Sequence, residues 1–190
     1  MIAMSTVLSL SRKWYSQALP ARTRFEKGQY AYLSEKPLEE LVKLARKIVG
    51  DTNDWKLFSN ALWENNEWQK AHQLTQLAEC LSDWCKKFCP QEAEIVTLKK
   101  WAASVRKEQF VGLIKGLGPR AYEQLLWYID GVNSIKLDRH IANFLQNSLG
   151  PTVSEADGIA ALKAVAKKMG ISATNLDARI WDYMQAQANA

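Results

Sequence analysis

Hydrophobic residues recur every three or four positions along most of the 190-residue chain, and no segment alternates hydrophobic and polar residues as a half-buried strand does. After Pro37, for example, Leu38, Leu41 and Ala45 fall on one face of a helix that Gly50 is placed to end. Hydrophobic residues make up 47% of the chain, which is enough to bury a substantial core. The pattern therefore predicts an all-α fold of about ten helices.

Prolines, glycines and capping residues predict where these helices begin and end. We expect a first helix over residues 4–18 that stops near Pro20 and is followed by a polar, basic stretch over 21–30. Further helices are expected over 37–49, from Asp54 to about residue 62, over 68–88, over 91–105, as two short helices around the sequence KGLG, and over 138–149, 154–169 and 175–187.

The length suits one domain, or a main helical domain with a small lobe folded against it. We expect residues 31–190 to form a helical domain of two lobes with a cleft between them. Residues 1–30 are expected to be a basic segment packed on that domain.

Positive charge is concentrated in two segments, although the net charge is only +5. Residues 1–30 hold five cations against one anion, and residues 97–120 hold six against one. Such segments favour a polyanion as partner, because each neutralised phosphate releases counterions. Charge alone leaves open a solvated surface with chance clustering.

The cysteines and the N-terminal segment indicate a soluble protein of a reducing compartment. Cys80, Cys85 and Cys89 are odd in number and form no CxxC pair, which favours reduced thiols over a disulfide framework or a zinc site. The first apolar run precedes its basic residues, the reverse of a signal peptide, and no stretch reaches the ~20 apolar residues of a membrane span. We expect a cytoplasmic monomer (at the nucleoid if bacterial), with no metal, cofactor or membrane contact.

The segment FVGLIKGLGPRAYEQLLWYI predicts two short helices joined by a tight turn. We expect Phe110, Leu113 and Ile114 to form the apolar face of the first helix, and the glycines of the sequence Gly116-Leu117-Gly118 to allow positive φ and close approach of another backbone. Pro119 suits the first position of the second helix, whose free amides favour a phosphate, and Lys115 and Arg120 flank the turn. The alternative is an ordinary corner between two helices.

This segment and the one after it resemble the helix-hairpin-helix of the endonuclease III-type DNA glycosylase superfamily. That family carries L-x-G-h-G-x-x-[TA], a second helix, a loop and an aspartate; here IKGLGPRA is followed by LDRHIANFL. Asp138 lies eighteen residues after Arg120, a spacing typical of the family. The tail NLDARIWDYM and the early segment SNALWENNEWQKA are looser matches, and the resemblance covers roughly residues 37–187.

The resemblance implies that Asp138 is the catalytic residue. A carboxylate facing the deoxyribose stabilises the positive charge that builds as the N-glycosidic bond breaks, after the nucleotide has left the stack. His140 is expected to orient that carboxylate or to contact a phosphate. An aspartate before IANFL is equally suited to cap a helix, and a histidine there is as often structural, so both alternatives stay open.

Four residues lie where the family places the wedge that fills the hole left by a flipped base: Trp63, Asn65, Asn66 and Trp68. Their alternative role is packing in the core, which is the commoner fate of tryptophans at helical spacing.

Departures from the family pattern refine the expected chemistry. Arg120 stands where strand-cleaving members have a lysine, and a guanidinium stays protonated and cannot form a Schiff base. Tyr122 replaces a small residue between the hairpin helices, and no cysteine follows Cys89 to hold the family's iron–sulfur cluster.

Together these features predict a monofunctional DNA glycosylase that acts on damaged or mismatched bases in double-stranded DNA. One alternative is a non-catalytic DNA-binding protein on the same scaffold, and another is a helical interaction protein without a nucleic-acid role.

Overall fold

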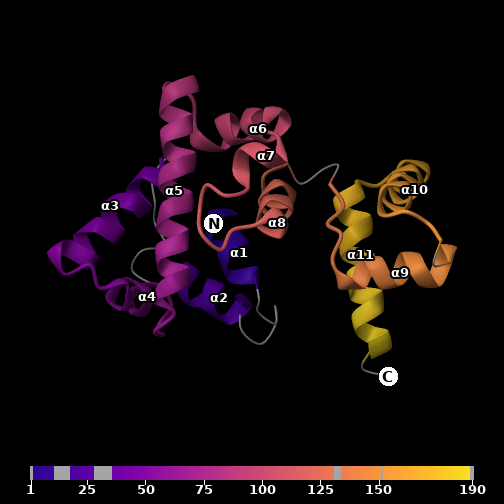
Figure 1. Cartoon of the computed structure of the whole chain (residues 1–190), viewed down its shortest axis with the longest axis horizontal. Helices are drawn as coiled ribbons and strands as arrows, with labels where there is room; N and C mark the ends of the chain where they lie inside the picture. The colour runs from indigo at the N-terminus through magenta and orange to yellow at the C-terminus, as the bar shows by residue number, and fades with distance from the viewer. Residues whose placement is uncertain (1, 11–17, 28–35, 131–133, 151, 189–190) are drawn as a thin grey trace. The chain divides into compact units, whose positions relative to one another are not determined.

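The computed structural model describes residues 2–10, 18–27, 36–130, 134–150 and 152–188 (Figure 1). Within these ranges every regular element is a helix, which confirms the all-α prediction. The chain divides into two compact units, Met1–Ile129 and Asp130–Ala190, each with its own hydrophobic core. The predicted boundary at residue 30 and the predicted cleft between two lobes stay predictions.

The α-helices of unit 1 are α1 (Ile2–Ser9), α2 (Leu19–Lys27), α3 (Pro37–Val49), α4 (Trp55–Trp63), α5 (Trp68–Phe88), α6 (Glu94–Ser104), α7 (Lys107–Phe110) and α8 (Pro119–Asp130), with a short 3-10 turn, η2 (Gly50–Thr52), after α3.

Helix α5 is the centre of unit 1 and packs against α1, α3, α4 and α6. Its sequence places Leu74, Leu77 and Leu81 three to four residues apart, and all three side chains are buried. The helix ends before Pro90, as expected, because a proline cannot continue it.

The basic N-terminal segment contributes helices to the core of unit 1. Helix α2 spans most of the stretch that was expected to follow the first helix, so the expectation that Pro20 marks a helix end is wrong. Pro20 is instead the second residue of α2, where the missing N–H has no partner to lose. Val7, Leu8 and Phe25 are buried. The expected first helix ends by Ser9 in the described part, and residues 11–17 lie outside the description.

Other predicted helix ends are confirmed. Helix α3 begins at Pro37 and is followed by Gly50 at φ +52°. The Asp54 side chain caps α4 by accepting the N–H of Lys56 at 2.9 Å. The Ser154 hydroxyl caps α10 by accepting the N–H of Asp157 at 3.2 Å.

Unit 2 is a smaller bundle of α9 (Arg139–Leu149), α10 (Glu155–Lys168) and α11 (Ala173–Ala188). Helix α11 contacts both α9 and α10. The buried core is made by Ile135, Ile141, Leu145, Leu162, Ala166, Ala173, Leu176 and Ile180.

Candidate nucleic-acid interface

The turn between α7 and α8 is longer than the sequence predicts. Helix α7 ends at Phe110, so the expected apolar helix face of Phe110, Leu113 and Ile114 is wrong. Phe110 and Ile114 are buried, but Leu113 is 59% exposed. Val111, the C-cap, is extended with ψ 123°, which ends the helix, and Gly112 follows with φ +97°.

Of the two glycines in the turn, only Gly116 has the strained conformation that was expected. Its φ is +87°, and a Cβ at this position would collide with the Gln73 side chain of α5. Gln73 Nε2 donates to the Lys115 carbonyl at 3.1 Å, which fixes the turn to α5. Gly118 has neither a positive φ nor an atom close to the position of a Cβ.

Backbone donors are left free where α8 begins. The N–H groups of Ala121 and Tyr122 donate to the Gly118 carbonyl, at 3.0 and 3.2 Å. Among the described residues the N–H groups of Gly118 and Arg120 donate to no acceptor. Leu117 is 1% exposed, so its side chain belongs to the core and only its backbone faces the turn. Free N–H groups at a helix N-terminus attract anions.

The cations beside the turn differ in how far they are neutralised. Lys107 pairs with Glu123 at 3.2 Å, and Lys100 pairs with Glu92. Lys115 and Arg120 are exposed, and no carboxylate in the described part of the chain pairs with them. These two exposed cations are close in sequence to the free N–H groups, and their charge is available to a polyanion.

Tyr122 fills the space between α7 and α8 where the resembled family has a small residue. Its ring lies 5.7 Å from the ring of Phe110, and its hydroxyl donates to the Val105 carbonyl at 2.9 Å. Burial raises the pKa of the Tyr122 hydroxyl above its ordinary value. Tyr122 is a packing residue that braces the turn.

Asp138, in unit 2, is the N-cap of α9. Capping a helix was the alternative to a catalytic role that the sequence left open. Its Oδ1 accepts the N–H groups of His140 and Ile141, at 2.9 and 3.1 Å. Its Oδ2 lies 3.6 Å from Lys136 Nζ, and 24% of the side chain is exposed. One oxygen is therefore engaged by backbone, while the other faces a cation at the surface.

His140 contacts two residues of α11 that no sequence pattern indicates as part of a site. Its Nε2 lies 3.1 Å from Gln185 Nε2, and its ring meets Trp181 edge-on at 5.8 Å. A hydrogen bond between these nitrogens requires that His140 Nε2 carries no proton and accepts from the Gln185 amide. If the Gln185 amide is flipped, its oxygen faces His140 and the Nε2–H donates to it instead. The chain separation of about forty residues left no local signal for this cluster.

The four residues expected to form a wedge divide into two pairs. Trp63 is completely buried, and its Nε1 donates to Asn65 Oδ1 at 2.6 Å. Asn65 in turn donates to Glu67 Oε2 at 2.9 Å, so both residues organise the corner between α4 and α5. Trp63 is therefore a core residue, which was the alternative. Asn66 is exposed, and Trp68 is 44% exposed.

A family model matches residues 63–185, which is well over half of the chain. The chain belongs to this family. It is described as a domain of unknown function, DUF8548. No curated protein and no solved structure matches the chain. The DUF8548 region begins at Trp63 and contains the turn, Asp138 and His140, whereas α1, α2 and α3 lie before it.

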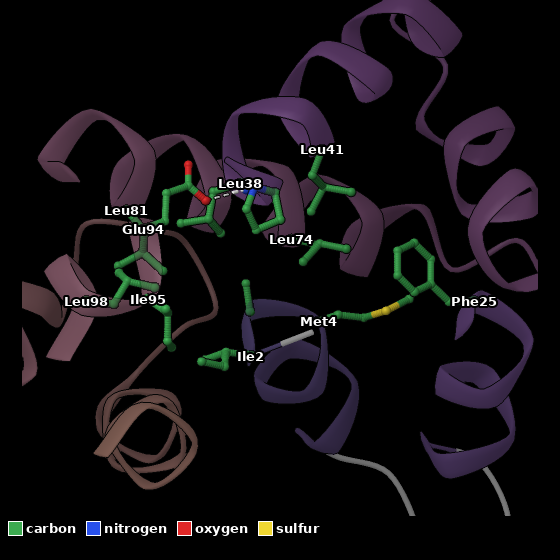
Figure 2. Close-up of a pocket in the computed structure, with 12 residues that line it drawn as sticks. Ile2, Met4, Phe25, Leu38, Leu41, Leu74, Leu81, Glu94, Ile95 and Leu98 are labelled. Atoms are coloured by element: carbon green, nitrogen blue, oxygen red, sulfur yellow. Dashed lines mark hydrogen bonds between the residues drawn. The ribbon is translucent and has the colours of Figure 1, made fainter. Parts of the chain in front are cut away.

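A cavity of about 260 Å³ lies in unit 1 of this DUF8548 protein, partly outside the matched region (Figure 2). Among the described residues that line it, only Glu94 is charged, and it is buried: Oε2 accepts the N–H of Leu38 at 2.8 Å, and Oε1 accepts that of Glu39 at 3.4 Å. Burial raises the pKa of Glu94. Both oxygens are engaged, so the cavity offers an apolar surface without an obvious reactive group. Its apolar lining comes from Ile2, Ala3, Met4, Phe25, Pro37, Leu38, Leu41, Leu74, Leu81, Ile95 and Leu98.

Neither the Cys85 thiol nor a cluster of metal ligands adds a reactive centre among the described residues. Burial raises the pKa of the Cys85 thiol to about 11, so it is protonated and a weak nucleophile at neutral pH. The described residues contain no group of three or more His, Cys, Asp or Glu side chains placed to hold a metal ion. None of the described helices has the length and apolar character needed to cross a membrane.

Proposed function

We propose that this DUF8548 protein binds double-stranded DNA through the turn over residues 115–120. The observation that carries the proposal is that, within the described part of the chain, the N–H groups of Gly118 and Arg120 have no acceptor and the cations Lys115 and Arg120 have no carboxylate partner. The N–H groups can hold one phosphate oxygen, and the two cations neutralise neighbouring phosphates. Such contacts position a duplex without selecting its sequence.

The proposed activity is monofunctional release of a damaged or mismatched base, with Asp138 as the catalytic residue. Two features support this: the resemblance of the sequence around Asp138 to the glycosylase motif, and the partial exposure of the Asp138 side chain. A carboxylate at the sugar would stabilise the developing positive charge and orient water. Arg120 in place of lysine argues against a Schiff-base intermediate, so the strand is expected to stay intact.

The capping role of Asp138 favours a second candidate, a non-catalytic DNA-binding protein. The hydrogen bonds of Oδ1 to His140 and Ile141 explain an aspartate at this position without any chemistry. In that case DNA binding through the turn is retained, and no base is released.

The binding proposal is tested by reversing both charges at the turn. We expect Lys115→Glu with Arg120→Glu to weaken binding to a duplex of random sequence and to lower the salt slope of log Kd by about 2, because at least two phosphate contacts are lost. The matched control is Lys47→Glu with Lys56→Glu, which changes the net charge equally at exposed positions on α3 and α4. Equal losses in both double variants would show that only net charge matters.

The catalytic proposal is tested with Asp138→Asn and a panel of modified duplexes. Asparagine is as good an N-cap as aspartate, so the variant keeps α9 while it loses the negative charge. We expect base release by the wild type, no release by the variant, and unchanged DNA affinity. Binding without release by the wild type across the panel would establish the non-catalytic candidate instead.

A further inference from the structure

The tip of the segment between α7 and α8 presents two apolar side chains to solvent. Leu113 is 59% exposed and Val111 is 37% exposed, while Phe110 and Ile114 beside them are buried. The proposed phosphate contacts through residues 115–120 do not involve this tip. Single exposed leucines are common on protein surfaces, so the surroundings of the tip decide whether it has a role.

The tip is held in place from both sides. The N–H of Val111 donates to the Lys107 carbonyl at 2.9 Å, and that of Leu113 donates to the Phe110 carbonyl at 3.2 Å. After the tip, Ile114 is buried and the Lys115 carbonyl is bonded to Gln73 of α5. A side chain presented by an anchored backbone has little conformational entropy to lose on binding.

Exposed positive charge flanks the tip along the chain. Arg106 precedes it and Lys115 follows it, and in the described part of the chain neither forms an ion pair with a carboxylate. An apolar tip between cations complements a ligand with an apolar interior and an anionic edge. A DNA duplex has this structure, since its stacked bases lie between two rows of phosphates.

We propose that Leu113 is a wedge that inserts between base pairs at a weakly stacked step, such as a mismatch, while the turn over residues 115–120 holds the backbone. The proposal rests on the proposed DNA binding and adds which feature of the DNA is selected. Apolar side chains used in this way partly unstack a step and kink the duplex, and unstacking costs least where pairing is already impaired. The wedge is distinct from Trp63, which is enclosed in the core.

The test uses the full chain, its Leu113→Ala variant, and two duplexes that differ by a single mismatch. We expect the wild type to prefer the mismatched duplex, and Leu113→Ala to lose roughly fivefold to tenfold of its affinity for that duplex but less than twofold for the intact one. 2-Aminopurine beside the mismatch should brighten with the wild type and not with the variant. Leu57→Ala is the matched control, because Leu57 is 48% exposed on α4, away from the tip in sequence.

The outcomes separate the wedge from the proposed function. If Lys115→Glu with Arg120→Glu weakens binding but Leu113→Ala changes neither affinity nor fluorescence, DNA binding stands and the wedge is overturned. If the wild type shows no salt-sensitive affinity for either duplex, both proposals fail. If Leu113→Ala reduces binding to vesicles of anionic phospholipid and leaves DNA binding unchanged, the tip is a membrane contact and the wedge is overturned.

Discussion

Glu94 is a buried carboxylate that caps the N-terminus of helix α3 from a distant part of the chain. Lys36, at the N-cap position, makes no side-chain capping bond, and Glu94 from α6 accepts the N–H groups of Leu38 and Glu39 instead. Burial disfavours the charged form and raises its pKa, while the two N–H donors oppose that shift. The side chain is therefore a sensitive point for the pH dependence of stability.

Glu94→Gln should change how the free energy of unfolding depends on pH. Because the pKa of Glu94 is raised in the folded state, its protonation stabilises the protein fully below the ordinary value of 4.5, and that contribution is lost as the pH rises through the folded pKa. Glutamine stays neutral and does not lose this contribution. We therefore expect urea unfolding to show that the free energy of unfolding of the variant rises relative to that of the wild type from pH 3.5 to pH 7.5.

Glu92→Gln provides the control for this measurement. Its bond with Lys100 lowers the pKa of Glu92, so the stabilisation by Glu92 is present above its ordinary pKa and lost as the pH falls. The free energy of unfolding of the Glu92→Gln variant should therefore fall relative to that of the wild type as the pH rises. A flat difference for Glu94→Gln would contradict a raised pKa.

Asp138 combines a confirmed cap with a proposed catalytic role, and stability measurements separate the two. Asp138→Ala removes the acceptor for two backbone N–H groups, so we expect a loss of about 1 kcal/mol in the free energy of unfolding. Asp138→Asn should lose only a few tenths, since it retains an acceptor oxygen. Ser154→Ala removes the cap of α10 and serves as a comparison, with an expected loss of similar size in the free energy of unfolding. Equal losses for both Asp138 variants would show that charge, rather than capping, stabilises α9.

At the scale of elements, the turn between α7 and α8 depends on one glycine. Gly116→Ala places a Cβ at φ +87° and displaces the Gln73 side chain from the Lys115 carbonyl. We expect a loss of about 1–3 kcal/mol in the free energy of unfolding, because a positive φ is strained and a hydrogen bond is broken. Urea unfolding measures this loss, and DNA affinity should fall with it.

Gly118→Ala is the paired control, because the site is open and its backbone angle is not in the left-handed region. We expect a change below about 0.5 kcal/mol, since the lower entropy of the unfolded chain offsets the weaker N-cap preference of alanine. If the two glycine variants lose equal stability, the strain assigned to Gly116 is wrong.

Helices with local boundary signals were predictable from the sequence. Pro37 with Gly50 and the apolar spacing up to Pro90 place α3 and α5 correctly, since these signals act within a few residues. Helix α2 was missed because a proline near the end of one apolar segment also suits the first turn of the next helix. The spacing of Leu113 predicts a buried helix face, but the helix ends at Phe110 because Val111 is extended, and Leu113 is exposed.

The candidate site was predictable in its residues but only partly in its geometry. The sequence indicates Lys115, Arg120 and Asp138 through motif and charge. It does not reveal Glu94 or the contacts of His140 with Gln185, because partners separated by forty or more residues leave no periodic pattern. Such contacts follow from packing, which depends on the whole fold.

At the scale of the whole molecule, two separate cores imply two levels of stability. Unit 2 has a small core within about sixty residues, a size at which burial offsets chain entropy only marginally. The cluster in unit 1 is much larger and includes α5. We therefore expect the amides of α9, α10 and α11 to exchange with solvent faster than those of α5.

Leu145→Ala tests the independence of the two units. Leu145 is buried and packs against Gly158, so truncation should cost about 2–5 kcal/mol within unit 2. Hydrogen exchange read by mass spectrometry should show faster exchange in α9–α11 and little change in α5. Leu77→Ala, in the core of unit 1, should show the opposite distribution. Equal acceleration everywhere in either variant would mean that the chain unfolds as one cooperative unit.

The cap that α6 supplies to α3 also has a consequence for the order of synthesis. A ribosome adds residues at roughly 5–20 per second, so Leu38 is made about 3–11 s before Glu94, which lies 56 residues later. Until then the N–H groups of Leu38 and Glu39 lack their native acceptor. The nascent N-terminal helices therefore cannot complete their native contacts before α6 has left the exit tunnel, and in that interval their apolar faces are open to a chaperone.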